Sequence, residues 1–303
     1  MLDLSIIVVN WNTRQMLADC LNSVQATIKD LAFEIVVVDN GSTDGSQAML
    51  RAQFPQVRLI ENSSNVGFAR ANNQALAASG GRYALLLNSD ALLLDHAVQA
   101  MLDLAEREPR AGIVGAQLVG ADGVFQASHT PFPNLWQEFM ILTGTGRAFY
   151  DRRYPSHGPE EDKGPQKVDY VEGACLLVRR QAFDEAGGMD EGYFMYAEEV
   201  DWCYTLRKRG WQVWYQPSAK VIHLGGGSSK GRRTQREADL YRSRVRFFRK
   251  HYGDRAANLL KLQIYGLTAV KIAAHRLLRW VSRGHWGRPV VPWRDLAREL
   301  KEA

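Results

Sequence analysis

The sequence predicts an α/β fold in which a parallel β-sheet has helices on both faces. Two observations predict this fold. Apolar runs of strand length alternate with stretches of helical spacing as far as residue 107, and the apolar runs end in clusters of Asn, Asp and Ser. A chain of 303 residues that is 46% hydrophobic can bury one large core, or a domain with an appendage.

The N-terminal part contains four strand-and-helix units. Strands are expected at four apolar runs, residues 4–9, 33–38, 57–61 and 83–87. The helices that follow are expected at about residues 16–24, 43–51, 67–79 and 96–107. Gly80 and Gly81 predict the end of the third helix. Strands that alternate with helices in this way are typical of parallel pairing.

The remaining elements are less regular. Residues 144–169 are rich in Gly, Pro and charge and have no periodicity, which predicts a functional loop or an insertion. Further strands are expected at residues 171–178, 211–215 and 219–223. One helix should include Phe183, and another should span residues 198–207, with acidic residues at its start and basic ones at its end, as the helix dipole favours.

Polar clusters follow the first four strands. They are Asn10-Trp11-Asn12, Asp39-Asn40, residues 62–65 and Asn88-Ser89-Asp90. In open α/β sheets ligands bind at the carboxyl ends of the strands, so these clusters should meet at one crevice. Any one cluster could instead form only a turn or a cap, but four in succession favour a shared site.

Two residues are candidates for metal binding. Asp90 offers a hard anionic oxygen just after a buried strand, which suits Mg²⁺ or Mn²⁺ completed by phosphate oxygens. His223 also follows a strand and would be a neutral imidazole ligand beside the Gly-rich residues 224–229. The alternatives are a helix N-cap for Asp90 and a structural role for His223.

Glu198, Glu199 and Asp201 place three carboxylates in one helical turn beside aromatic residues. Like charges and apolar neighbours both raise a carboxylate pKa, which suits a general base that takes a proton from a hydroxyl. The alternative is an acidic first turn that stabilises its helix through the dipole.

Several function classes lack their signatures. GxxxxGK[ST], GxGxxG after the first strand and GxSxG are absent, which argues against P-loop, dinucleotide-binding and nucleophile-elbow enzymes. Cys20, Cys175 and Cys203 have no CxxC spacing, so neither a disulfide framework nor a zinc site is indicated. The N-terminus has no basic region and a short apolar run, so we expect a strand, no signal peptide and a cytoplasmic location.

Charge divides the chain into two parts. Residues 1–224 carry 19 basic and 27 acidic side chains, whereas residues 225–303 carry 19 basic and 6 acidic ones. Such a basic segment suits anionic lipid, a diphosphate-bearing molecule or nucleic acid. The amphipathic residues 259–281 are too charged to span a bilayer, but they suit the inner face of the plasma membrane, with Trp280 and Trp286 as interfacial anchors. The alternative is two helices that pack on the rest of the chain. Nucleic acid is not expected, because no nucleic-acid motif accompanies the charge.

Taken in order, seven segments resemble the motifs of the inverting glycosyltransferases of family 2, particularly the rhamnosyltransferase-like members. The resemblance covers roughly residues 3–225. The segments are IIVVNWN (6–12), VDNGSTDGS (38–46), NVGFARANN (65–73), LLLNSD (85–90), GACLLVR (173–179), GGMDE (187–191) and FMYAEEVDWCYTLRKRG (194–210).

The resemblance implies a GT-A fold at residues 1–225, followed by a basic helical extension at residues 226–303. Its nucleotide-sugar-binding half would be residues 1–110 and its acceptor-binding half residues 111–225, with the loop at 144–169 beside the acceptor.

The resemblance also implies roles for the residues at the strand ends. Asp39 would read the base, Asn88 would lie near the ribose or diphosphate, and Asp90 would hold Mn²⁺ or Mg²⁺ with His223. Asn10, Asn12 and Asn65 would line the same donor pocket. At position 88 the family often has Asp, so Asn88 is a departure that bears on metal affinity.

For the base, the resemblance implies the second acid of the pair, Glu199, where many members have Asp. Glu198 and Asp201 remain alternatives. The base would deprotonate the acceptor as it attacks the anomeric carbon from the face opposite the leaving diphosphate, so that configuration inverts.

The expected function is transfer of a sugar, such as rhamnose from a dTDP-sugar, to a polysaccharide or lipid-linked glycan. Two alternatives are a catalytically silent nucleotide-sugar-binding module and a nucleotidyltransferase; the latter lacks the usual Gly-rich loop after its first strand.

Overall fold

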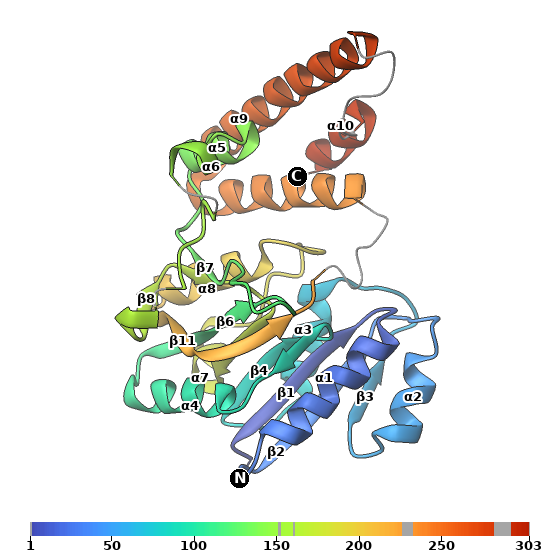
Figure 1. Ribbon diagram of the computed structural model, residues 1–303, viewed down its shortest axis with the longest axis vertical. Coiled ribbons are helices and arrows are strands. Elements are labelled where there is room, and N and C mark those ends of the chain that lie inside the picture. The colour runs from blue at the N-terminus through green and yellow to red at the C-terminus, as the bar shows by residue number, and fades with distance from the viewer. Residues whose placement is uncertain (1, 151–152, 160, 226–232, 282–291, 303) are drawn as a thin grey trace. The chain divides into compact units, whose positions relative to one another are not determined.

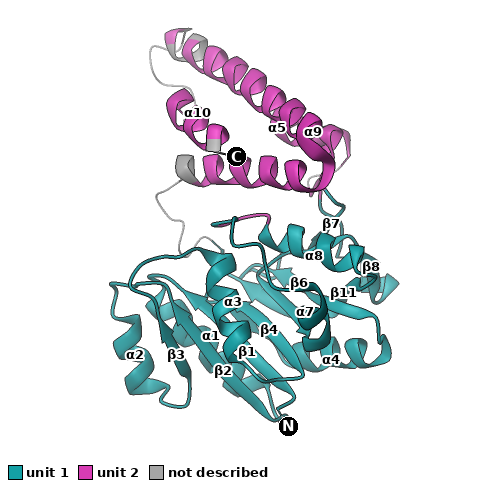
Figure 2. Cartoon of the chain, turned by 180° about the vertical axis from the view of Figure 1, so that it is seen from behind, with its two compact units in different colours: residues 1–132, 156–194, 198–228 teal, residues 133–155, 195–197, 229–303 magenta. Residues whose placement is uncertain are grey.

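The computed structural model describes residues 2–150, 153–159, 161–225, 233–281 and 292–302, which form two compact units (Figures 1 and 2). Unit 1 comprises residues 1–132, 156–194 and 198–228, and unit 2 comprises residues 133–155, 195–197 and 229–303. Unit 2 therefore includes two segments that precede the expected extension. The Gly-rich residues 226–229 and Trp286 lie outside the described residues.

Unit 1 is built on a mixed sheet with the strand order β3-β2-β1-β4-β10-β6-β11-β5, and β8 also pairs with β11. Its strands are β1 (Leu4–Asn10), β2 (Phe33–Asp39), β3 (Arg58–Glu61), β4 (Tyr83–Asn88), β5 (Ala91–Leu93), β6 (Ala111–Val119), β8 (Gln166–Val168), β10 (Cys175–Arg179) and β11 (Gln212–His223). Two further short strands, β7 (His129–Thr130) and β9 (Tyr170–Val171), pair with each other.

The first four strands are parallel, as predicted. The sheet as a whole is mixed, because β10 runs antiparallel to both β4 and β6. The chain leaves β6 and enters β10 at the same edge of the sheet. It is not carried back to the opposite edge by a crossover helix, as it would be before a parallel strand.

Helices cover both faces of the sheet. They are α1 (Arg14–Thr27), α2 (Ser46–Gln53), α3 (Phe68–Ala78), α4 (Ala97–Arg107), α7 (Arg180–Ala186) and α8 (Glu198–Lys208), with a short 3₁₀ turn at Glu161–Lys163. Leu4, Ile6 and Val8 of β1 pack with α1, α2 and α4, whereas Ile7 packs with α3, α7 and α8. Alternate residues of one buried strand thus serve two cores, as in a sheet covered on both sides.

Three local expectations differ from the structure. The strands expected at 211–215 and 219–223 are one strand, β11, with an irregular register between Gln216 and Lys220. The strand expected at 171–178 is divided into β9 and β10 by residues 172–174. The sequence pattern also predicts no strand at 111–119, where β6 is buried at every position. Gly112 and Gly115 interrupt the apolar run of this strand and hide it from the sequence pattern.

Unit 2 is helical. Its helices are α5 (Leu135–Thr143), α6 (Gly146–Phe149), α9 (Arg233–Val281) and α10 (Trp293–Glu302). α9 is interrupted at Gly253, whose φ of 86° and ψ of 171° are not helical. α5 and α10 both pack on α9, and the buried Glu138 of α5 pairs with Arg244 of α9 at 2.6 Å. Among the described residues, no helix is both long and apolar enough to cross a membrane.

Candidate functional site

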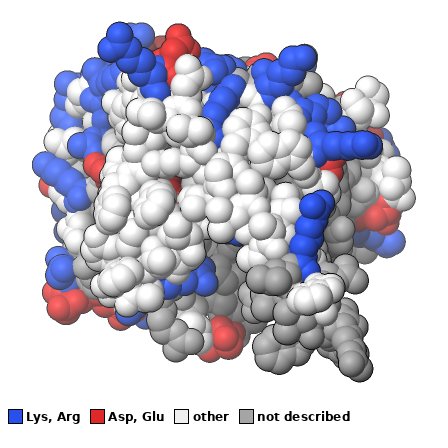
Figure 3. Space-filling view, turned by 90° about the horizontal axis from the view of Figure 1, so that it is seen from above, with Lys and Arg blue, Asp and Glu red and all other residues white. Residues whose placement is uncertain are grey.

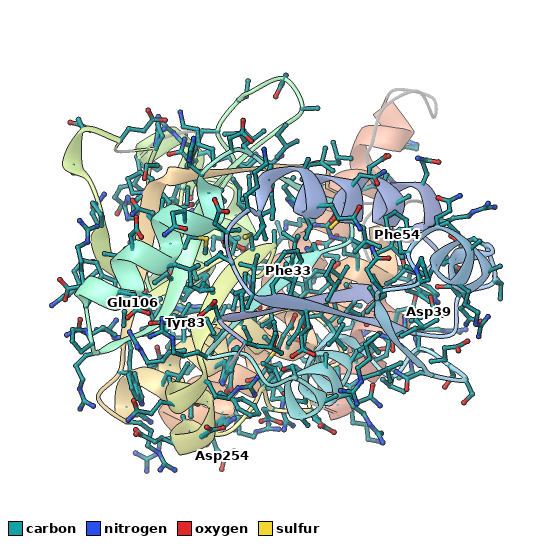
Figure 4. All side chains as sticks on the ribbon, turned by 90° about the horizontal axis from the view of Figure 1, so that it is seen from below. Phe33, Asp39, Phe54, Tyr83, Glu106 and Asp254 are labelled. Atoms are coloured by element: carbon teal, nitrogen blue, oxygen red, sulfur yellow. The ribbon has the colours of Figure 1, made fainter. Side chains whose placement is uncertain are left out.

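The carboxyl ends of three parallel strands bring the predicted donor-binding residues to one edge of the sheet. Asn10 is the register partner of Asp39, and Val9, one residue earlier in β1, is the partner of Asn88. Figure 4 labels Phe33 and Asp39, which are the two ends of β2. This placement follows from parallel pairing, because the strands β1, β2 and β4 all end in the same direction.

Asp39 is fully buried and its carboxylate is held by three donors. Oδ2 accepts from Asn10 Nδ2 at 2.7 Å, and Oδ1 accepts from the Ser42 N–H at 2.9 Å and from Gln47 Nε2 at 2.8 Å. These bonds compensate for burial and fix the carboxylate at the strand end. Gln47 was not predicted, because it lies inside a helix and carries no distinctive sequence signal.

The four polar clusters contact one another. Thr13 Oγ1 lies 2.6 Å from Asn10 Oδ1 and 2.8 Å from Ser89 Oγ, which links the first cluster to the fourth. Asn40 accepts from Asn62 Nδ2 at 2.9 Å, which links the second to the third. Together with the bond from Asn10 to Asp39, these contacts join the four clusters by hydrogen bonds at one edge of the sheet.

Asn12 and Asn65 orient the loops of this site. Asn12, with φ of 53°, accepts from the Thr43 N–H at 2.7 Å. Asn65 Oδ1 accepts from the Gly67 N–H at 3.0 Å, and a Cβ on Gly67 would lie 2.7 Å from the carbonyl oxygen of Phe194. The loop at Gly67 therefore lies directly against the backbone of Phe194, which precedes α8.

Asp90 and His223 are brought together by strand pairing. β5, which follows Asp90, pairs antiparallel with β11, and the Leu224 N–H donates to the Asp90 carbonyl at 2.9 Å. As a result, His223 Nε2 lies 3.5 Å from Asp90 Oδ1. The N-cap alternative for Asp90 is wrong, because the next element is a strand and the following helix begins at Ala97.

Gln126 holds His223 at two points. Its Oε1 lies 3.0 Å from His223 Nδ1, and its Nε2 donates to the His223 carbonyl at 2.8 Å. An Nδ1–H donated to Gln126 leaves the lone pair of Nε2 directed at Asp90, which is how histidine ligands are commonly oriented. No sequence signal marks Gln126, because it follows a strand that the pattern did not predict.

Asp90 and His223 fit a divalent metal. Their facing oxygen and nitrogen are the right donor types, and their side chains are only 12% and 22% exposed. Within the described part of the chain there is no group of three or more His, Cys, Asp or Glu residues that could hold a metal. A metal bound here would therefore take its remaining ligands from water or substrate.

Glu198 and Glu199 lie in the first turn of α8. One carboxylate oxygen of each, Oε2, is buried with no hydrogen-bond partner among the described residues. Burial raises the pKa of Glu199 to about 7, and burial together with the charge of Glu199 raises the pKa of Glu198 well above its ordinary value. A carboxyl with a pKa near 7 can exchange a proton at neutral pH.

The glutamate pair is adjacent to the strand ends. A Cβ on Gly173 would lie 3.6 Å from Cβ of Glu199, and the next residue, Ala174, accepts from the Asn88 N–H at 2.9 Å. Asp201 is buried and accepts from the Tyr193 hydroxyl at 3.2 Å. Asp201 therefore has a structural partner, whereas Glu199 lies beside Gly173, one residue before the bond that joins Ala174 to Asn88.

A separate cavity of about 670 Å³ lies elsewhere in unit 1, near the end of α8 and the start of β11. Its lining includes His129, Lys167 and Arg207, and it contains none of the predicted site residues.

Comparison with known proteins places these features in context. The family model described as glycosyl transferase family 2 matches residues 5–187. The N-acetylglucosaminyl-diphospho-decaprenol L-rhamnosyltransferase of Mycobacterium tuberculosis is 35% identical over 203 residues. That alignment covers 62% of this chain and 66% of the relative, so the chain spans just under two thirds of the relative's length.

Two solved structures share the fold. The mannosyltransferase PcManGT from Pyrobaculum calidifontis, in complex with GDP-Man and Mn²⁺, superposes with a TM-score of 0.57 at 17% identity and covers 99% of this chain and 87% of its own. GalNAc-T7 with UDP, GalNAc and Mn²⁺ has a TM-score of 0.59 at 16% identity, and covers 82% of this chain and 48% of its own. At this identity the likeness establishes the fold alone.

Proposed function

The chain belongs to glycosyl transferase family 2 and has a GT-A fold, and we propose that it transfers a sugar from a nucleotide-diphosphate donor to an acceptor hydroxyl with inversion of configuration. One observation carries the proposal. The Asp90–His223 pair and the Glu198–Glu199 pair both adjoin the carboxyl end of β4. The reaction needs a group that holds a metal beside the leaving diphosphate and a base beside the acceptor, and the two pairs would supply them.

The donor would bind along the ends of β1, β2 and β4. Asp39 would read the nucleotide base. Because its carboxylate is buried and accepts from Asn10, Ser42 and Gln47, an N–H of the base would replace one of these donors. Asn88 would lie near the ribose or diphosphate. Asn12 and Asn65 would contribute by shaping the loops on either side.

Asp90 and His223 would hold Mn²⁺ or Mg²⁺ beside the diphosphate. When bound, the ion would neutralise charge on the leaving nucleoside diphosphate. Asn88 stands where a second carboxylate is common, so we expect metal affinity to depend strongly on the donor's own phosphate oxygens.

Glu199 would act as the base. Its position beside Gly173 directs it to the edge where the donor's sugar would lie, and its raised pKa makes it a stronger base than an ordinary carboxylate. It would take the proton of the acceptor hydroxyl as that oxygen attacks the anomeric carbon and the nucleoside diphosphate departs. Glu198, whose pKa is raised well above its ordinary value, is the alternative base.

The names of the rhamnosyltransferase relatives suggest rhamnose as the sugar, and that of the mycobacterial relative suggests a lipid-linked acceptor. The proposed donor is dTDP-rhamnose. This proposal extends the activity in the name of the mycobacterial relative to the present chain, of which the alignment covers 62%.

A donor screen tests the function. The purified chain would be incubated with UDP-, GDP- and dTDP-sugars and Mn²⁺, and release of the nucleoside diphosphate would be measured. We expect release from one donor class and its loss when the metal is chelated. No turnover and no binding with any donor would contradict the proposal.

Glu199→Gln separates an enzyme from a silent binding module. The substitution keeps the size of the side chain but removes the base, so turnover should fall by roughly 10²- to 10⁴-fold with donor affinity retained. Asp184→Asn, an exposed change on α7, is the control and should behave as wild type. Full biological function in the Glu199→Gln variant would instead support a binding module.

A further inference from the structure

The second segment of α9, residues 254–281, has one buried face. Ala257, Leu260, Ile264 and Thr268 are at most 3% exposed and recur every three or four residues. Tyr265 also contacts Trp293 of α10, with ring centroids 5.3 Å apart. The segment is therefore anchored in unit 2 through one side.

The opposite face is exposed and apolar. Leu259, Leu262, Val270 and Trp280 are 52%, 68%, 63% and 79% exposed. On a helix of 3.6 residues per turn these four side chains lie within about a quarter of the circumference, away from the buried face. We call these four residues the apolar strip. Exposed apolar side chains gathered on one face mark an interaction surface rather than scattered surface residues.

Basic residues outnumber acidic ones in this segment. Residues 254–281 contain three arginines, two lysines and one acidic residue, Asp254, at their start. Arg255 and Arg276 lie in the same helical segment and are exposed. In Figure 3, Lys and Arg side chains outnumber Asp and Glu side chains at the margin of a broad area without charged residues. This combination is typical of helices that lie in the interface of an anionic bilayer.

Charge complementarity favours a membrane over two other occupants. A second copy of the chain would bring two basic faces together, which electrostatic repulsion disfavours. Nucleic acid would match the basic residues but would leave the apolar strip without a partner, because its phosphates are bound mainly by Lys and Arg. A bilayer offers both anionic headgroups and an apolar interior.

We infer that the apolar strip lies flat on an anionic membrane, with its leucine, valine and tryptophan side chains among the lipids and the exposed Arg255 and Arg276 on the headgroups. The inference rests on the proposed function and deepens it, because a lipid-linked acceptor would be held at a membrane surface. Binding of the chain to the membrane requires neither the sugar donor nor turnover.

Vesicle flotation of the full chain tests the inference. Vesicles of phosphatidylcholine would be compared with vesicles that also contain phosphatidylglycerol. We expect binding only to the anionic vesicles, and weaker binding at high salt, because added ions screen the headgroup attraction.

Val270→Asp and Leu262→Asp test the apolar strip. Each should weaken vesicle binding by roughly tenfold or more, because a charge replaces a side chain that enters the bilayer. Val124→Asp is the matched control, since Val124 of unit 1 is 62% exposed and lies outside the strip. Both strip variants should keep the wild-type unfolding temperature, because the replaced side chains are already exposed.

Three results would overturn the inference: no binding of the wild-type chain to anionic vesicles, equal binding by the strip variants, or a solution dimer that Val270→Asp dissociates. Donor hydrolysis in the same preparations separates this inference from the proposed function. Hydrolysis without vesicle binding refutes the membrane surface alone, whereas vesicle binding without any donor hydrolysis refutes the proposed transfer reaction alone.

Discussion

At the scale of single residues, Glu199 is the group whose protonation should be visible in kinetics. Its carboxyl has a pKa of about 7 because it is buried in the first turn of α8. A base must be deprotonated to act, so kcat/KM should rise about tenfold per pH unit below pH 7 and level off above it. The check is a pH profile of transfer beside a pH profile of donor binding. A transfer rate that does not change across this range would rule out Glu199 as the base.

Gln126 provides a second prediction at this scale, because it bonds both the ring and the carbonyl of His223. Gln126→Leu removes both bonds with little change in volume, so Mn²⁺ affinity in the presence of a nucleoside diphosphate should fall by about 10- to 100-fold. Electron paramagnetic resonance of free Mn²⁺ measures this directly. Gln99→Leu, on the exposed face of α4, is the control. Equal affinity in both variants would show that His223 does not need Gln126, or does not bind metal.

At the scale of elements, the approach of the loop at Gly67 to the segment before α8 should be sensitive to one methyl group. Gly67 has φ of 91°, and a Cβ would lie 2.7 Å from the Phe194 carbonyl oxygen. Gly67→Ala should therefore lower the free energy of unfolding by about 1–3 kcal/mol and weaken donor binding through Asn65. Gly80→Ala, where a Cβ meets nothing within 4 Å, should be neutral or slightly stabilising. Urea denaturation of the two variants provides the comparison, and equal stability would contradict the close approach.

The elements also show which sequence patterns are informative. The alternation of strands and helices predicted β1 to β4 and their parallel pairing, because each unit is local in sequence. β6 was not predicted, because Gly112 and Gly115 interrupt its apolar run. At Gly115 a Cβ would lie 2.4 Å from the side chain of Val171, so the glycine reflects a distant contact that no local pattern encodes.

At the scale of the whole molecule, the glutamate pair should make stability depend on pH. The unfolded chain releases the protons of Glu198 and Glu199 near pH 4.5, whereas the folded chain retains them to higher pH. In the folded chain Glu199 releases its proton near pH 7. The unfolded state is therefore favoured as pH rises across this interval, and the free energy of unfolding should fall by roughly 3 kcal/mol or more. Denaturation at several pH values tests this. The double variant Glu198→Gln, Glu199→Gln should lack the dependence, and a wild-type stability that rises over the same interval would refute it.

Residue identity and order along the chain were sufficient to predict that the polar strand ends meet at one edge of the sheet. Asn10, Asp39 and Asn88 each end a strand, and strands joined by helices must end at the same edge. Other features depend on contacts between distant segments. The 3.5 Å approach of His223 to Asp90 requires β5 to pair with β11, the raised pKa of Glu199 requires its burial, and the bonds from Gln126 require the chain to return past β6. The order of strands and helices along the chain follows from local sequence patterns. Burial and the distances between side chains are properties of the packed chain.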